Sequence, residues 1–275
     1  MSLLKDKNFQ TRIITGILFV GVVVAGILIS EQTYNALLFA INLLCLIEFY
    51  NLTIEKHQTF FKVYLLSVVV FLSGVLLFFI PIPAYFTLAG PVLLFLIVFI
   101  QLAYQSKQPF ANIAFAFFGM IYISIPLALL FLNTDDPING YNPKLALLLF
   151  MLVWINDTGA YMAGNLIGKT KLFARISPKK TWEGFIGGVL LSMFVAALYG
   201  KYALLESPLL FCGLGLVIGI FSTLGDLIES QLKRSLNRKD SGTLLPGHGG
   251  FLDRFDGFLI AMPAAYFYLT LVSNR

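Results

Sequence analysis

The sequence predicts an all-α, polytopic integral membrane protein with about nine transmembrane helices. Of its 275 residues, 58% are hydrophobic and only 12% are charged, whereas a soluble domain carries about 25% charged residues. Mean hydropathy is +0.85, so the solvent for most of the surface must be lipid. Apolar runs of about twenty residues, the length that crosses a bilayer, also recur along the chain.

Nine apolar runs, separated by short polar or proline-containing breaks, give the expected spans. The first run follows a short polar lead and has no clear cleavage site, so we expect a retained helix rather than a signal peptide. The spans lie near 13–29, 34–52, 62–80, 84–104, 111–132, 145–163, 183–203, 209–229 and 256–272.

Most polar residues gather in the C-terminal half. Spans one to five form an N-terminal multispan region, 1–140, and spans six to nine form a C-terminal catalytic membrane region, 141–275, with polar loops 164–182 and 230–255. Basic residues concentrate in cytoplasmic loops of membrane proteins. With the N-terminus in the cytoplasm, all but three of the 19 lysines and arginines lie on that side. The C-terminus is then outside, and both loops face the cytoplasm, where we expect the active site.

Three acidic residues lie inside apolar runs, where charge is costly and usually functional. Asp157 and Asp226 lie toward the inner ends of spans six and eight, and Glu48 lies one turn from the inner end of span two. The alternative for each is an interfacial residue with a helix-packing hydrogen bond, and for Glu48 the two interpretations are balanced. If span eight continues as a helix, one face carries Asp226, Glu229, Ser230 and Lys233.

Two more acids, Asp253 and Asp256, are one turn apart where span nine begins, and a helix N-terminus favours negative charge. Gly257 beside them would let another backbone or a phosphate come close. Such an oxygen-only cluster suits a hard cation such as Mg²⁺, which shares substrate phosphates. A soft-metal site does not fit, because both cysteines are distant and His248 is the only nearby histidine. The alternative is a charged collar at a helix start.

The two basic loops have the composition of phosphate-binding segments. Loop 230–255 carries lysines and arginines and then Pro246–Gly250, whose backbone N–H groups can face an anion. Its lysines and arginines can donate charge-assisted hydrogen bonds to phosphate oxygens, while His248 could donate as well or lie idle. Gly164–Thr170 is one residue short of a P-loop and follows an apolar helix, so that motif is rejected. A topological anchor would explain the lysines of loop 164–182, but not the Ser, Pro, Thr, Trp and Glu among them.

Three stretches together resemble the phosphatidate cytidylyltransferase (CDP-diacylglycerol synthase) family. They are NDTGAY at 156–161, SPKKTWEG at 177–184, and the run from Ser230 to Asp256, with no departure at its polar positions. The matching part extends from about Trp154 to Gly257, while the N-terminal half agrees only in being multispan. The family's reaction converts CTP and phosphatidate into CDP-diacylglycerol and pyrophosphate.

The resemblance implies a role for each polar stretch. Asp226 and Asp253 match the metal-bridging acids, with Mg²⁺ as the metal and K⁺ as a candidate second ion. The phosphatidate phosphate is already an anionic nucleophile, so neutralising phosphate charge matters more than a strong base. The implied catalytic set is Asp226, Asp253, Asp256, Lys233, Arg234, Lys239, Asp240, His248 and Arg254. By motif position, CTP and the lipid phosphate are bound by Asp157, Lys169, Ser177, Lys179, Lys180, Thr181 and Glu183.

The expected partners are CTP, phosphatidate and membrane lipids, and the expected location is a bacterial inner membrane. Nucleic acid is not expected, because the aromatic residues lie in the spans and not among the basic loops. A CTP-dependent polyprenol or phytol kinase is the nearest alternative. A cation-coupled transporter is another, although its acids should lie near the membrane midplane. Gly215-x-x-x-Gly219 can pack helices within a monomer or in a homodimer.

Overall fold

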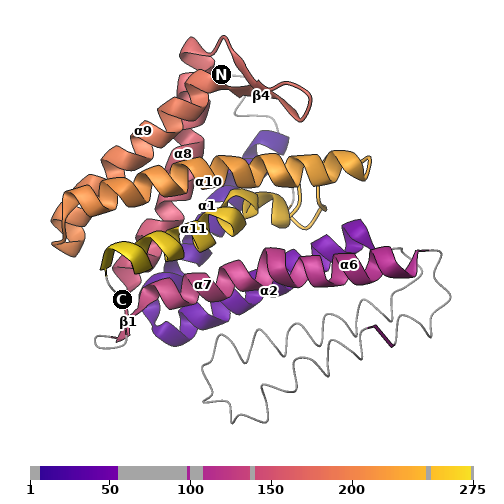
Figure 1. The fold of residues 1–275 in the computed structure, drawn as a ribbon, viewed down its shortest axis with the longest axis horizontal. Helices are drawn as coiled ribbons and strands as arrows, with labels where there is room; N and C mark the ends of the chain where they lie inside the picture. Colours follow the sequence, from indigo (N-terminus) through magenta and orange to yellow (C-terminus); the bar gives the residue numbers. More distant parts are fainter. Residues whose placement is uncertain (1–6, 55–97, 100–107, 137–139, 246–248, 274–275) are drawn as a thin grey trace.

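The computed structural model describes residues 7–54, 98–99, 108–136, 140–245 and 249–273, which are almost entirely helical (Figure 1). Two short hairpins accompany the helices, β1 (Asp135–Asp136) with β2 (Gly140–Tyr141), and β3 (Lys171–Phe173) with β4 (Ser177–Thr181). The α-helices are α1 (Lys7–Ile29), α2 (Glu31–Thr53), α6 (Pro109–Gly119), α7 (Ile125–Thr134), α8 (Pro143–Ile167), α9 (Trp182–Tyr199), α10 (Pro208–Ser235) and α11 (Asp256–Ser273).

Within this described part, five helices are long and apolar enough to cross a membrane. They are α2, α8, α10, the helix that α6 and α7 form through the π-turn η2 (Met120–Ser124), and α9 continued by the π-turn η3 (Gly200–Leu204). The apolar parts of α1 and α11 are shorter, Ile13–Ile29 and Asp256–Val272. Each expected span that falls on described residues thus coincides with an apolar helix, as an all-α integral membrane protein requires. Span 62–80 and all of span 84–104 except residues 98–99 lie outside the described residues.

Local sequence sets where several helices begin. Ser30 and Thr33 form a reciprocal capping box at α2, in which the Thr33 amide donates to Ser30 Oγ at 3.2 Å. Asn142 caps α8 through the Leu145 amide at 3.0 Å. Thr181 caps α9 through the Gly184 amide at 3.2 Å, so α9 begins where the β3–β4 hairpin ends.

Small residues let α8, α9 and α10 pack backbone to backbone. A Cβ atom on Gly188 would lie 2.6 Å from the Asn156 carbonyl oxygen, and one on Gly215 would lie 2.6 Å from the Ser192 carbonyl oxygen. A Cβ atom on Gly219 would lie 3.0 Å from the Val189 Cα. The Gly215–Gly219 pair therefore packs α10 on α9 within the chain, which is the first of the two uses expected for it.

A second close contact joins α10 and α11. A Cβ atom on Gly225 would lie 2.5 Å from the Asp256 carbonyl oxygen, and one on Gly257 would lie 2.8 Å from the Ser222 carbonyl oxygen. The sequence suggested that Gly257 would admit either another backbone or a phosphate, and in the structure the backbone of α10 occupies this space. This contact brings the acids of α10 beside the start of α11.

The N-terminal helices pack against this C-terminal group. α2 lies alongside α6 and α7, and α7 in turn packs on α11 (Figure 1). Tyr50 donates a hydrogen bond to the Ala116 carbonyl at 3.1 Å, and Ser124 donates to Asn42 Oδ1 at 2.9 Å. α1 contacts both α2 and α8. The two polar loops contain regular structure. The first contains the β3–β4 hairpin, and the second begins with α10 up to Ser235 and ends in the 3₁₀ turn η4 (Leu252–Arg254).

Candidate active site

A cavity of about 290 Å³ lies between α8, the β3–β4 hairpin, α9 and α10. The close packing of these helices brings together residues that are far apart in sequence. Both basic and acidic groups face the space, beside apolar and aromatic side chains such as Tyr161 and Phe185. Of the residues expected to form the site, it is lined by Asp157, Lys179, Lys180, Thr181 and Asp226.

An ion pair between Lys180 and Asp226 crosses this cavity. The side chains are 26% and 32% exposed, so solvent and ligands can reach both. Ser230, one turn along α10, donates to Asp226 Oδ1 at 3.2 Å, so span eight does continue as the helical face that the sequence predicted. Lys180 offers a charged donor to an anion, and Asp226 offers a carboxylate to a cation.

A second cavity, of about 210 Å³, lies on the α1 side of Asp157. Residues of α1, including Thr15, Gly16 and Phe19, form one wall, and Trp154 of α8 contributes apolar surface. The opposite wall carries the predicted site residues Asp253, Arg254 and Asp256. Asp157 lines both cavities, so the two spaces meet at this carboxylate.

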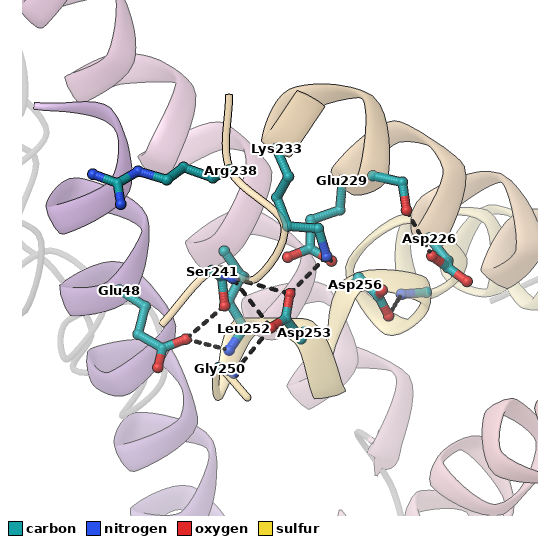
Figure 2. Close-up of polar contacts among 12 residues, drawn as sticks. Glu48, Asp226, Glu229, Lys233, Arg238, Ser241, Gly250, Leu252, Asp253 and Asp256 are labelled. Carbon is teal, nitrogen blue, oxygen red and sulfur yellow. Dashed lines mark hydrogen bonds and ion pairs between the residues drawn. The ribbon is translucent and has the colours of Figure 1, made fainter. Parts of the chain in front are cut away.

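Asp253 is held by hydrogen bonds on both of its oxygens (Figure 2). Lys233 Nζ donates to Oδ1 at 2.6 Å, and the amides of Ser241 and Gly250 donate to Oδ2 at 3.1 and 2.9 Å. Burial by itself would raise the pKa of Asp253, but the lysine and the amides outweigh it and hold the pKa below its ordinary value. The Asp253 carboxylate therefore holds the loop between α10 and η4 in place through these hydrogen bonds.

Lys233 also donates to Glu229 Oε2 at 3.2 Å, and Glu229 is fully buried. Its other oxygen, Oε1, has no hydrogen-bond donor in the described part of the chain. The Asp256 carboxyl group interacts with Glu229 across the α10–α11 contact and accepts a hydrogen bond from the Gly257 amide at 2.7 Å. The sequence placed Glu229 on the right helical face but gave it no role, and the structure puts it at the centre of this acidic group.

Both acids of the expected metal pair already have partners, but they differ in exposure. Asp226 accepts a hydrogen bond from Ser230 and pairs with Lys180 on a cavity that solvent can reach, whereas the Asp253 oxygens accept N–H donors from Lys233 and two loop amides. Among the described residues, no three His, Cys, Asp or Glu side chains are grouped so as to hold a metal ion. Asp226 fits a divalent cation once the cation replaces Lys180, and Asp253 fits one only if the cation replaces Lys233 or an amide.

The remaining predicted residues lie at the edges of this region. Glu183 accepts a hydrogen bond from the Thr170 amide at 3.1 Å and so closes the base of the hairpin. Arg234 donates to the Arg238 carbonyl at 3.3 Å. Ser177 is half-buried in β4, and His248 lies outside the described residues. The exposed members are Lys169, Arg234, Lys239, Asp240 and Arg254.

Comparison with known proteins gives consistent matches. The model of the cytidylyltransferase family matches residues 10–272. The phosphatidate cytidylyltransferase of Bacillus subtilis (strain 168) is 48% identical over 124 residues, which cover 45% of this chain and 46% of that protein. Proteins of the same name from Staphylococcus epidermidis (strain RP62A) and Staphylococcus aureus (strain COL) are 39% and 40% identical over 170 and 171 residues. These two alignments cover 60% of this chain and 64% of each relative, so the matched part spans between about half and just under two thirds of the relatives' length.

Proposed function

The chain belongs to the cytidylyltransferase family, and on that premise we propose that it transfers the cytidylyl group of CTP to phosphatidate. The products are CDP-diacylglycerol, a precursor for phospholipid biosynthesis, and pyrophosphate. The observation that carries this proposal is the cavity in which Lys179 and Lys180 face Asp157 and Asp226. It combines donors for phosphate oxygens with carboxylates in one space, and the relatives' name supplies the reaction.

In this mechanism the hairpin lysines bind the triphosphate. The Lys180–Asp226 pair opens when nucleotide binds, because the phosphates offer Lys180 a stronger anionic partner. Lys179 adds a second charge, and the Thr181 side chain stays engaged in capping α9. The phosphate of the lipid then attacks the α-phosphorus of CTP and pyrophosphate leaves. No general base is required, because the nucleophilic oxygen is already anionic.

Mg²⁺ is the proposed cofactor, with Asp226 and Asp253 as its ligands and K⁺ as a candidate second ion. When bound, the metal would neutralise phosphate charge in the transition state. Asp226 supports this proposal by its exposure on the cavity. To bind the metal, Asp253 would have to give up the hydrogen bond from Lys233 or from one of the loop amides.

The second cavity is the proposed place of the phosphatidate headgroup. Arg254 lines it and can bind the lipid phosphate, while Phe19 and Trp154 give it apolar walls beside α1. Asp157, which lines both cavities, lies where the lipid phosphate and the nucleotide would meet. The remaining basic residues at the rim would attract anionic membrane lipids.

The protein is an integral membrane protein, and its orientation is part of the proposal. The bias of basic residues supports a cytoplasmic active site, a cytoplasmic N-terminus and an external C-terminus. The bacterial source of the relatives supports a bacterial inner membrane as location. The division at residue 140 stays a prediction. A homodimer also stays a prediction, since the Gly215–Gly219 pair that suggested one packs within the chain.

The test is a product assay on the purified protein with Mg²⁺, CTP and phosphatidate. We expect CDP-diacylglycerol and an equal amount of pyrophosphate. Phosphorylation of a polyprenol by CTP without CDP-lipid would replace the proposal with the kinase. Cation-driven flux in sealed vesicles without CTP would replace it with the transporter. The comparisons give no support to either alternative.

A further inference from the structure

The loop between α10 and η4 narrows to a neck, with Ser241 on one side and Gly250 to Leu252 on the other. Two carboxylates from different parts of the chain hold this neck together (Figure 2). Asp253, within the loop, accepts the amides of Ser241 and Gly250 at 3.1 and 2.9 Å. Glu48, on α2, accepts the Ser241 hydroxyl at 2.8 Å and the Leu252 amide at 2.9 Å. Both acids thus bind Ser241 on one side of the neck, and on the other side Asp253 binds Gly250 while Glu48 binds Leu252.

Glu48 is built into this neck and does not lie at a surface. Glu48 is 3% exposed and Ser241 is 6% exposed. A Cβ atom on Gly250 would lie 2.6 Å from Glu48 Oε2, and one on Gly242 would collide with Oε1. The loop backbone therefore closes directly around the carboxylate. Burying a charge is costly unless hydrogen bonds compensate it, so the two donated bonds are what keeps Glu48 in place.

The contacts of Glu48 point to an indirect role. Glu48 lines neither of the two cavities. Both of its hydrogen bonds end on the same oxygen, Oε2, while Oε1 has no hydrogen-bond partner among the described residues. The side chain therefore acts through Ser241 and Leu252. Leu252 begins the η4 turn that carries Asp253 and Arg254 into the second cavity.

We propose that Glu48 is a positioning residue that fixes the loop of the active site to α2. It sets the place of Asp253 and Arg254, and with them the shape of the second cavity. The N-terminal helices are thereby part of the catalytic unit, which gives α2 a function beyond crossing the membrane. The effect on the loop rests on geometry alone, whereas the effect on turnover also rests on the proposed function.

The geometry makes a sharp distinction between two substitutions of Glu48. In Glu48→Gln, the amide oxygen can take the place of Oε2 and accept both hydrogen bonds. In Glu48→Ala, both donors lose their acceptor and are left buried. Ser241→Ala removes one donor and leaves α2 intact. Asn42→Ala is the matched control, because Asn42 is buried on the same helix but bonds to Ser124 instead of the loop.

The experiment measures hydrogen–deuterium exchange and CDP-diacylglycerol synthesis on the full chain in detergent or nanodiscs. In Glu48→Ala, we expect exchange of the backbone amides of 238–245 and 249–252 to rise about tenfold or more, as expected for lost hydrogen bonds. Turnover should fall about 100-fold, as for a site displaced by about an ångström. Glu48→Gln should stay within about threefold of the wild type in both measurements. Ser241→Ala should be intermediate, and Asn42→Ala should lower thermal stability without faster exchange in the loop.

Two results would overturn the proposal. One is unchanged loop exchange in Glu48→Ala. The other is a Glu48→Gln variant as impaired as Glu48→Ala, because the charge and not the hydrogen bonds would then be required. If Glu48→Ala does not fold, Ser241→Ala decides by the same exchange measurement. Exchange needs no substrate, so failure of the proposed reaction and failure of the positioning role can be told apart.

Discussion

Lys180 of the β3–β4 hairpin is ion-paired with Asp226 of α10, and this contact joins the two polar stretches of the C-terminal half. The hairpin supplies the cation and the helix supplies the anion, on opposite walls of one cavity. Both side chains are partly exposed, so a ligand can exchange with either of them without unfolding the site. The proposed function accordingly assigns phosphate to Lys180 and a divalent cation to Asp226.

Replacing Lys180 should weaken nucleotide use. In Lys180→Ala, we expect kcat/KM for CTP to fall about 10- to 100-fold, because a hydrogen bond to a charged group contributes about 1.5–3 kcal/mol. Lys171→Ala is the matched control, since Lys171 is an exposed lysine on the same hairpin that does not line the cavity. Steady-state kinetics with varied CTP measure the effect. An equal loss in both variants would show that the hairpin's total charge matters and not the position of Lys180.

Replacing Asp226 should abolish turnover while the protein stays folded. In Asp226→Asn, the ion pair with Lys180 is lost, but a partly exposed pair contributes only about 0–1 kcal/mol to stability. The measurements are CDP-diacylglycerol synthesis and the thermal unfolding midpoint, with and without Mg²⁺. We expect the shift of the midpoint by Mg²⁺ to disappear. Near-normal turnover would remove Asp226 from the proposed metal site.

Asp253 should behave differently, because it fixes the loop as well as being a proposed metal ligand. Asp253→Asn keeps one oxygen acceptor but places an amide group against Lys233 or against the backbone amides. We expect loss of turnover together with faster hydrogen exchange across the loop, even without Mg²⁺. A variant with wild-type loop exchange and normal turnover would contradict both roles.

The low pKa of Asp253 predicts a pH dependence of loop order. The folded-state pKa lies below the unfolded value of about 3.9, so the unfolded loop binds the proton more tightly. The stabilisation is therefore complete at neutral pH and is lost as pH falls below about 4 and through the folded-state pKa. Loop exchange, corrected for the intrinsic rate, should rise over this range. Asp253→Asn should remove this dependence, and Glu206→Gln, at the opposite end of α10, should keep it.

The spans that fall on described residues could be predicted because each is a local property of the sequence. An apolar run of the right length forms a helix in lipid wherever the rest of the chain lies. The face of α10 that carries Asp226 and Ser230 followed in the same way from helical periodicity. The polar stretches around Lys180 and Asp253 could also be found, since charged residues are conspicuous in so apolar a chain.

Contacts between distant segments could not be predicted. Nothing in the α1 run indicates that Thr15 and Phe19 line a cavity, because neither carries a charge that would single it out. The bonds from Ser241 and Leu252 to Glu48 join segments about 200 residues apart, and no local pattern encodes such a partner. Asp253 looked like a free metal ligand because its amide donors come from the folded loop and not from a helix.

The helix contact that builds the cavity can be tested at a single glycine. In Gly188→Ala, the new methyl group would lie 2.6 Å from the Asn156 carbonyl oxygen, so α8 and α9 must separate. Overpacking of this kind costs about 1–3 kcal/mol, and it should move Asp157 away from Asp226, which lies on the neighbouring α10. We expect a lower thermal unfolding midpoint and a loss of turnover larger than the loss of folded protein. Gly21→Ala is the control, since a Cβ atom there meets nothing within 4 Å and alanine favours the helix. Equal stability of the two variants would mean that α8 and α9 are not in backbone contact in the membrane.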